Sequence, residues 1–151
     1  MSQFGRGLDV PGVTWWACRV VNAPTRNSPW LVEIPGADVT ALVAPIYLSR
    51  RKIASRRSGT DLELGIAPEA VTILPNRAHQ KGSARNLWPA RIVRFENKTR
   101  FGVRYVELAV GGNFLPVSVT ASAISQMRLR VGLKVLLQLK ATALRLREPS
   151  R

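Results

Sequence analysis

The sequence predicts an all-β protein made of two tandem, small OB-like five-stranded barrels, each with one short helix. Two observations support this fold class: a weak internal repeat, and short apolar runs separated by turn residues. The chain has 151 residues, of which 46% are hydrophobic. That length is enough for one ordinary domain or two very small ones.

The repeat relates three segments of the first half to three of the second. The matches are "W-W-A-C-R-V-V" from Trp15 with "L-W-P-A-R-I-V" from Leu87, "L-V-E-I" from Leu31 with "Y-V-E-L" from Tyr105, and the segment from Ser58 with that from Val131. The offset stays near 72 to 76 residues in all three. Such regularity indicates two copies of one module.

The second copy has the composition of strands joined by tight turns. Strands are expected at 91–94, 103–110, 114–119, 135–139 and 143–146. The paired glycines of "G-G-N" at 111–113 predict a hairpin turn. Residues 120–129 predict a helix, with Thr120 as its N-cap and Gly132 beyond its end. Five strands with one helix favour a barrel of the oligonucleotide/oligosaccharide-binding type.

These patterns divide the chain into a degenerate first barrel at 13–74, a polar linker at 75–82 and a second barrel at 83–147. The copies differ most at 45–58, where the first has a longer helix with five basic residues. A charge run of this kind is a solvated face or loop, or else an interaction patch.

Charge is concentrated in the second half. The chain has 23 basic and 9 acidic residues, for a net charge of +14. Residues 1–74 hold eight basic and six acidic side chains, for +2, and the remainder holds fifteen and three, for +12. The electrostatic field of this charge attracts anions, but it does not indicate whether the anion is a small oxyanion or a nucleic acid.

Several classes of protein are disfavoured. One cysteine, Cys18, and one histidine, His79, allow neither an internal disulfide nor a Cys/His zinc site. No signal peptide or membrane-length apolar run is present, so a cytoplasmic protein without membrane insertion is expected. No nucleophile with a base and no suggestive carboxylate pair occurs, so an enzyme is not expected.

The motifs of the second copy resemble those of the molybdate-binding Mop domain. They are "S-A-R-N" before an apolar strand, then "V-E-L…G-G…L-P-V-S-V-T", then "L-K-V-L-L-Q-L-K-A-T-A-L", within 83–146. That domain occurs in molbindins and in the C-terminal regulatory region of molybdate ABC-transporter ATPases. In the first copy, "L-E-L-G-I-A-P-E-A-V" is similar to the "G-I-R-P-E" segment of related TOBE barrels, with Ala67 where arginine is usual. The phosphate-binding loop of an ATPase is absent.

The resemblance implies a site for molybdate or tungstate, so molybdenum would enter only as an oxyanion and no metal ligands are predicted. One wall would be Ser83, Ala84 and Arg85; the other, from a neighbouring subunit, would be Lys140, Ala141 and Thr142; Thr120 matches a further hydroxyl position. A tetrahedral dianion has only acceptors, so its site must offer hydroxyls, N–H groups and cations. Read without the resemblance, Lys140 is a solvated strand-end lysine, Arg85 a linker arginine and Thr120 a helix cap.

Two departures from the family pattern stand out. Ala123 replaces a second hydroxyl, with Ser122 one position earlier. In the first copy Ala67 aligns with Lys140, and "P-G-V-T" at 11–14 stands in place of "S-A-R-N". We therefore expect no equivalent site in the first copy.

Three functions remain open. The first is non-catalytic binding of molybdate or tungstate for storage, homeostasis or regulation of molybdate transport, in a homo-oligomer (a trimer if stand-alone) and with a molybdate ABC transporter as a further partner. The second is a nucleic-acid-binding barrel that uses the basic surface, with Trp15, Trp16 and Trp88 as either stacking platforms or core residues. The third is a purely structural, partner-binding tail.

Overall fold

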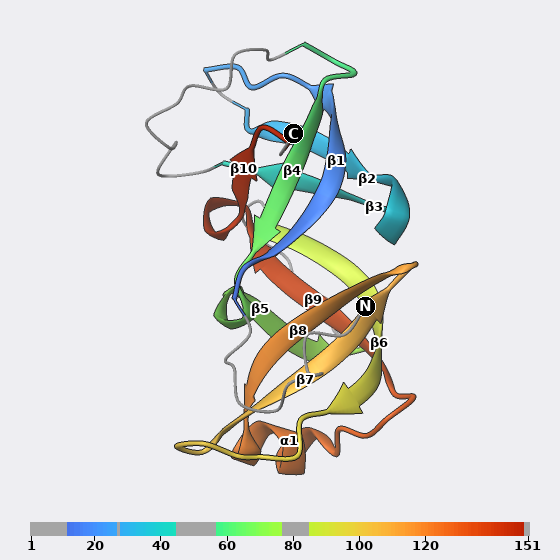
Figure 1. Cartoon of the computed structure of the whole chain (residues 1–151), viewed down its shortest axis with the longest axis vertical. Helices are drawn as coiled ribbons and strands as arrows, with labels where there is room; N and C mark the ends of the chain where they lie inside the picture. The colour runs from blue at the N-terminus through green and yellow to red at the C-terminus, as the bar shows by residue number, and fades with distance from the viewer. Residues whose placement is uncertain (1–11, 27, 45–56, 77–84, 150–151) are drawn as a thin grey trace.

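The computed structural model describes residues 12–26, 28–44, 57–76 and 85–149, with Arg85 described by its backbone alone. These residues form two five-stranded antiparallel sheets and one α-helix (Figure 1). The strands are β1 Thr14–Asn22, β2 Trp30–Ile34, β3 Val39–Val43, β4 Asp61–Ile66, β5 Val71–Pro75, β6 Arg85–Phe95, β7 Val103–Val110, β8 Asn113–Thr120, β9 Lys134–Lys140 and β10 Arg145–Arg147. The helix is α1 Ala121–Met127, and the 3₁₀ turns are η1 Pro35–Ala37, η2 Pro68–Ala70 and η3 Ala141–Ala143. The predicted all-β fold class is confirmed.

The two sheets exchange their last strands. Their orders are β10-β4-β1-β2-β3 and β5-β9-β6-β7-β8. β5 follows β4 in the chain but pairs with β9, with Val71 opposite Leu139. β10 follows β9 but pairs with β4, with Leu146 opposite Leu64 (Figure 1). Each sheet therefore contains one strand from the other half of the sequence.

The internal repeat is visible in the strand register. Trp16 pairs with Leu64 as Trp88 pairs with Leu137, and equivalent irregularities follow at 20–22 of β1 and 92–94 of β6. The two copies therefore have the same strand pairing.

One of the three predicted matches has the wrong register. Val32 lies opposite Val20, and Leu108 lies opposite Ile92, the repeat partner of Val20. Val32 thus corresponds to Leu108, two residues beyond the partner that "L-V-E-I" and "Y-V-E-L" suggested. A shift of two residues keeps every side chain on the same face of a strand, so the apolar pattern could not reveal the error.

A single core joins the sheets. The fully buried side chains include Val32 and Leu64 of the first sheet and Leu108 and Leu137 of the second, all in one cluster. Trp16 and Trp88, which are 6% and 2% exposed, belong to this cluster, and their rings contact each other between the copies. These two tryptophans are core residues, so they cannot act as stacking platforms for bases.

The local signals of the second copy located its helix cap and its hairpin turn, but two strand starts were wrong. β6 begins at Arg85 and not at residue 91, and β10 begins at Arg145 and not at residue 143, because residues 141–143 form η3. Thr120 caps α1, since its Oγ1 accepts the Ala123 N–H at 3.0 Å. The helix ends at Met127, before the predicted residue 129, because Arg128 adopts a left-handed conformation with φ of 52°. β7 ends at Val110 and β8 begins at Asn113, as "G-G-N" predicts.

Two predictions lie mostly outside the described residues. They are the first-copy helix at 45–58, of which 45–56 are not described, and the linker at 75–82, of which 77–82 are not. In the described part of the chain, no helix has the length and apolar character needed to cross a membrane.

Candidate anion-binding site

The start of β6 lies beside the end of β9, and this pairing brings two predicted segments together. Arg85 is opposite Lys140, and Asn86 is opposite Leu139. Ser83 and Ala84 directly precede Arg85 in the sequence but lie outside the described residues. The resemblance implied that the lysine comes from a neighbouring subunit, and within one chain the strand register also sets the backbones of Arg85 and Lys140 side by side. The two residues, 55 positions apart in the sequence, meet because β6 pairs with β9.

The turn after β9 presents exposed side chains on both sides of a buried anchor. Lys140 and Thr142 are exposed, and Ala141 between them is buried. The Ala141 carbonyl accepts the Ala44 N–H at 2.9 Å, which fixes η3 against the end of β3. An ammonium group and a hydroxyl are thus held at the junction of the two copies, where both can donate to an anion.

Asn86, the last residue of "S-A-R-N", holds the start of β6 in place. Asn86 is 6% exposed. Its side-chain amide forms hydrogen bonds with the backbone N–H and the carbonyl of Leu42 on the edge strand β3. The Leu42 N–H donates to Asn86 Oδ1 at 2.8 Å, and Asn86 Nδ2 donates to the carbonyls of Leu42 at 2.9 Å and Leu139 at 3.4 Å. Both ends of the amide are used, so Asn86 positions Arg85 and does not itself face a ligand. Sequence reasoning did not assign this role.

Thr120 lies at the opposite end of the second sheet. It pairs with Val103 at the end where β6 finishes at Phe95, while Arg85 begins β6 at the other end. Its hydroxyl is exposed and accepts a hydrogen bond from the first turn of α1. Within one chain, the fold therefore does not bring Thr120 to Arg85 and Lys140.

The first copy has the same backbone at the equivalent turn but different chemistry. Ala67 precedes η2 with φ and ψ of −79° and 144°, close to the −70° and 137° of Lys140 before η3. Ala67 is buried and apolar, and Glu69 occupies the position that corresponds to Thr142. An acidic side chain repels an anion, and no cation is supplied at this turn.

The position of Asn86 is also changed in the first copy. Thr14 takes its place at the start of β1, opposite Ile66, and lines a hollow with Pro116 of β8. Pro116 corresponds to Leu42 but has no N–H, so the acceptor that Asn86 provides for Leu42 is not required there.

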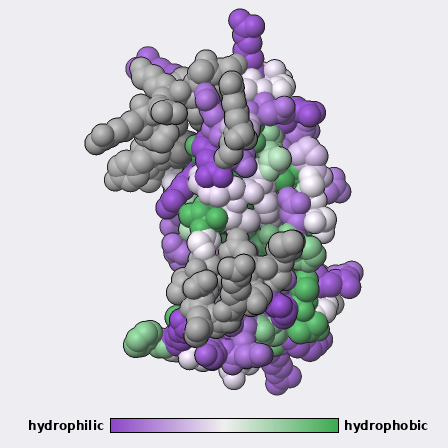
Figure 2. Space-filling model, in the orientation of Figure 1, coloured by the Kyte–Doolittle hydropathy of each residue, from purple (hydrophilic) through white to green (hydrophobic). Residues whose placement is uncertain are grey.

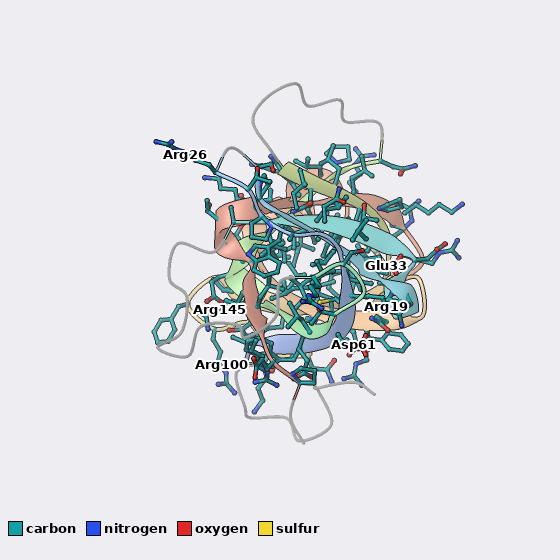
Figure 3. All side chains as sticks on the ribbon, turned by 90° about the horizontal axis from the view of Figure 1, so that it is seen from above. Arg19, Arg26, Glu33, Asp61, Arg100 and Arg145 are labelled. Atoms are coloured by element: carbon teal, nitrogen blue, oxygen red, sulfur yellow. The ribbon has the colours of Figure 1, made fainter. Side chains whose placement is uncertain are left out.

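Differences between repeat partners also explain part of the charge asymmetry. In the first copy Arg19 lies opposite Glu33 and Asp61, and its guanidinium is 3.8 and 3.4 Å from their carboxylates (Figure 3). In the second copy the equivalent Arg91 lies opposite Ala109 and Lys134. Two acidic partners are thus replaced by a neutral and a basic residue, which raises the positive potential of the second sheet.

Other chemistries find little support among the described residues. They contain no group of three or more His, Cys, Asp and Glu side chains that could hold a metal ion. Cys18 is buried, and burial, with smaller contributions from Glu63 and Asp61, raises the pKa of its thiol to about 12. The thiolate, which is the reactive form, is therefore suppressed at neutral pH.

Two hollows lie between the copies at repeat-related places. One, of about 620 Å³, is lined by Leu87, Trp88 and Thr40 among others. The second, of about 280 Å³, is lined by their counterparts Trp15, Trp16 and Phe114. The described residues that line them include none of the predicted anion ligands, so they are separate from the candidate site.

The fold and the strand-end pairing define a two-copy β protein with an exposed cation at the junction of its copies. Residues 82–146 match the model of the TOBE domain, in agreement with the predicted resemblance to Mop and TOBE domains. A crystal structure of the cytoplasmic molybdate-binding protein ModG with molybdate bound is similar in fold, with a TM-score of 0.75. The match covers 90% of this chain and 96% of that chain at 20% identity. A search of the curated proteins found no match.

Proposed function

We propose that this chain binds molybdate or tungstate without catalysis, at the junction where β6 begins and β9 ends. The observation that carries the proposal is the register of Arg85 opposite Lys140. It sets the backbone of Arg85, the third residue of "S-A-R-N", next to Lys140 of "K-A-T", and these two segments correspond to the walls of the Mop site. The ligands would be Ser83, Ala84, Arg85, Lys140, Ala141 and Thr142.

The chemistry of these residues suits a small dianion. Molybdate has four acceptor oxygens, and the segments offer two hydroxyls, two cations and several backbone N–H groups. Removing two negative charges from water without matched cations costs several kcal/mol per charge. Arg85 and Lys140 together would match the charge of the dianion, and Asn86 holds the strand that carries Arg85.

Thr120 enters this proposal through a second copy of the chain. It lies at the far end of the second sheet from Lys140, so it reaches an anion held by Arg85 and Lys140 only if it comes from another subunit. We therefore propose a homo-oligomer, a trimer if the protein is stand-alone. Anion binding between subunits would stabilise the oligomer by mass action.

The cellular role that fits is oxyanion storage or homeostasis in the cytoplasm, or regulation of a molybdate ABC transporter. The fold of ModG, whose structure holds molybdate, and the TOBE domain at 82–146 support this role. No covalent step is proposed.

Isothermal titration with molybdate, tungstate and sulfate at fixed ionic strength tests the proposal. Arg85→Gln and Lys140→Gln each remove a charge-assisted hydrogen bond worth about 1.5–3 kcal/mol, so molybdate affinity should fall roughly tenfold to a hundredfold. Arg145→Gln is the matched control, because Arg145 is an exposed arginine on β10.

The outcomes separate a built site from general attraction. Equal losses in Arg145→Gln and Lys140→Gln would show that only net charge attracts the anion. A wild-type chain that gives no binding heat and no rise in melting temperature with any of the three anions rules the proposed function out.

A further inference from the structure

The β6–β7 hairpin ends in a two-residue turn that carries an exposed phenylalanine. Arg100 and Val103 exchange both backbone hydrogen bonds, at 2.8 and 2.9 Å. Phe101 and Gly102 between them have φ of 51° and 74°. Positive φ at both central residues is the pattern of a type I′ turn, which favours Asn and Gly.

Phe101 therefore contributes nothing to folding that is visible in the structure. A bulky residue at positive φ is sterically disfavoured. Its ring is fully exposed, so it gains no burial in return. A strained, solvent-facing aromatic residue at a hairpin tip points to a role in recognition.

The sequence on either side of Phe101 is basic. Residues 91–134 contain eight basic and two acidic side chains, and one of the acidic residues, Glu107, is buried. Lys98 and Arg100 belong to the same hairpin loop. The start of α1 is attached to this turn, because the Ala121 N–H donates to the Gly102 carbonyl at 2.8 Å.

The helix adds further positive charge at this end of the molecule. Arg128 is the C-cap of α1 and Arg130 follows two residues later, and both are exposed. Figure 1 shows the β6–β7 loop and α1 at the end of the second sheet that faces away from the first, and Figure 2 shows mainly hydrophilic residues there. We call Phe101 with Lys98, Arg100, Arg128 and Arg130 the hairpin-tip surface.

We propose that the hairpin-tip surface binds single-stranded nucleic acid, with the Phe101 ring stacked on a base and the surrounding cations on phosphates. Single-strand binders combine these two features, and every base offers a face for stacking. A duplex conceals its base faces, and one ring offers little apolar area to insert into a membrane. The inference is independent of the proposed oxyanion function, because the two sites share no residue and lie at opposite ends of β6.

Fluorescence anisotropy with a labelled 20-nucleotide oligothymidylate and an RNA oligomer of the same length tests the inference. Phe101→Asn keeps a residue that accepts the turn conformation, so the fold should persist. Because base–aromatic stacking is worth about 1–3 kcal/mol per base, affinity should fall roughly fivefold to a hundredfold.

Two further measurements complete the test: the salt dependence of oligomer binding, and binding to phosphatidylserine vesicles. Lys98→Gln should lower the slope of log affinity against log salt by about 0.7, the value for one phosphate contact on a single strand. Arg145→Gln, on the opposite sheet, should leave that slope unchanged. Equal affinity of Phe101→Asn and the wild type would overturn the proposal, as would binding to phosphatidylserine vesicles without binding to either oligomer, or binding to neither.

Discussion

The indole rings of Trp16 and Trp88 stack on each other, with centroids 5.8 Å apart and planes inclined by 28°. The two residues are repeat partners, so each copy supplies the same aromatic side chain to their common core. Trp88 also donates its Nε1–H to the Thr40 carbonyl of the other sheet, at 2.9 Å. The contact that joins the copies is therefore made by the residue that the repeat conserves at the start of each long strand.

Replacing Trp88 should destabilise the whole molecule. Trp88→Ala should lower the free energy of unfolding by about 3–5 kcal/mol, as for other large aromatic residues removed from cores. Trp88→Phe keeps a ring but leaves the Thr40 carbonyl without its donor, and should cost less, about 1–3 kcal/mol. Urea unfolding followed by circular dichroism measures both, with the exposed Val131→Ala as control. Unequal unfolding of the two sheets in Trp88→Ala would contradict the single core.

Strand exchange predicts that neither half folds alone. A fragment of residues 1–80 lacks β10, which pairs with β4, and a fragment of 81–151 lacks β5, which pairs with β9. Each fragment would expose an unpaired edge and part of the core. We expect each to show no cooperative thermal transition and an equimolar mixture to recover one. A cooperative transition in 81–151 alone would contradict this prediction.

Local rules predicted the helix cap and the hairpin turn of the second copy, because these signals act over a few residues. The cap at Thr120 and the turn at Gly111 depend on their immediate neighbours, and both are found where expected. The exchange of β5 and β10 depends on pairing across the whole chain, which no local pattern encodes. The candidate site differs in the same way between local and long-range features. Its motif residues could be identified from the sequence. The pairing of Arg85 with Lys140 and the hydrogen bond between Asn86 and Leu42 could not, because they join strands far apart in the sequence.

Loss of the Asn86 side chain should weaken both stability and anion binding. Asn86→Ala leaves the Leu42 N–H and carbonyl without their partners at a partly buried edge. A buried group left unsatisfied costs about 1–3 kcal/mol, so the free energy of unfolding should fall by roughly that amount. Molybdate affinity should fall as well, because Arg85 directly precedes this anchor in β6. Affinity unchanged in a destabilised Asn86→Ala would show that the anchor does not position the site.

Cys18 should make the protein less stable in alkaline solution. Its thiol has a pKa raised from 9.0 to about 12 in the folded chain, chiefly by burial. The unfolded chain therefore releases this proton first, and stability should decline as pH rises from about 9 towards 12. Comparing urea unfolding of the wild type and Cys18→Ala across this range isolates the contribution. The decline should be shallower in Cys18→Ala, and identical slopes would contradict the prediction.

Cys18 should also resist alkylation while the protein is folded, because a buried, protonated thiol is a poor nucleophile. At pH 8 the reaction with iodoacetamide should follow unfolding, with slow modification in buffer and fast modification in denaturing urea. Rapid modification of the folded chain would show that the site opens without unfolding.

Gly65 is required by the ring of Trp15, which lies across it. A methyl group at Gly65 would be 2.7 Å from ring carbons of Trp15, closer than van der Waals contact allows. The ring has little freedom to move away, because the guanidinium of Arg147 on β10 lies over it, 3.7 Å from the ring centroid. That guanidinium is itself held by Glu63, with Nε and Oε1 3.0 Å apart. Gly65→Ala should therefore cost about 1–3 kcal/mol, the usual range for overpacking.

A double-mutant cycle tests this cause. In a Trp15→Ala background the added methyl group meets no ring, so Gly65→Ala should then cost much less than in the wild type. Urea unfolding of the four proteins gives the coupling energy. The double variant should lose less stability than the sum of the losses in the two single variants. Additive costs would mean that the glycine is needed for its backbone and not for the contact with Trp15.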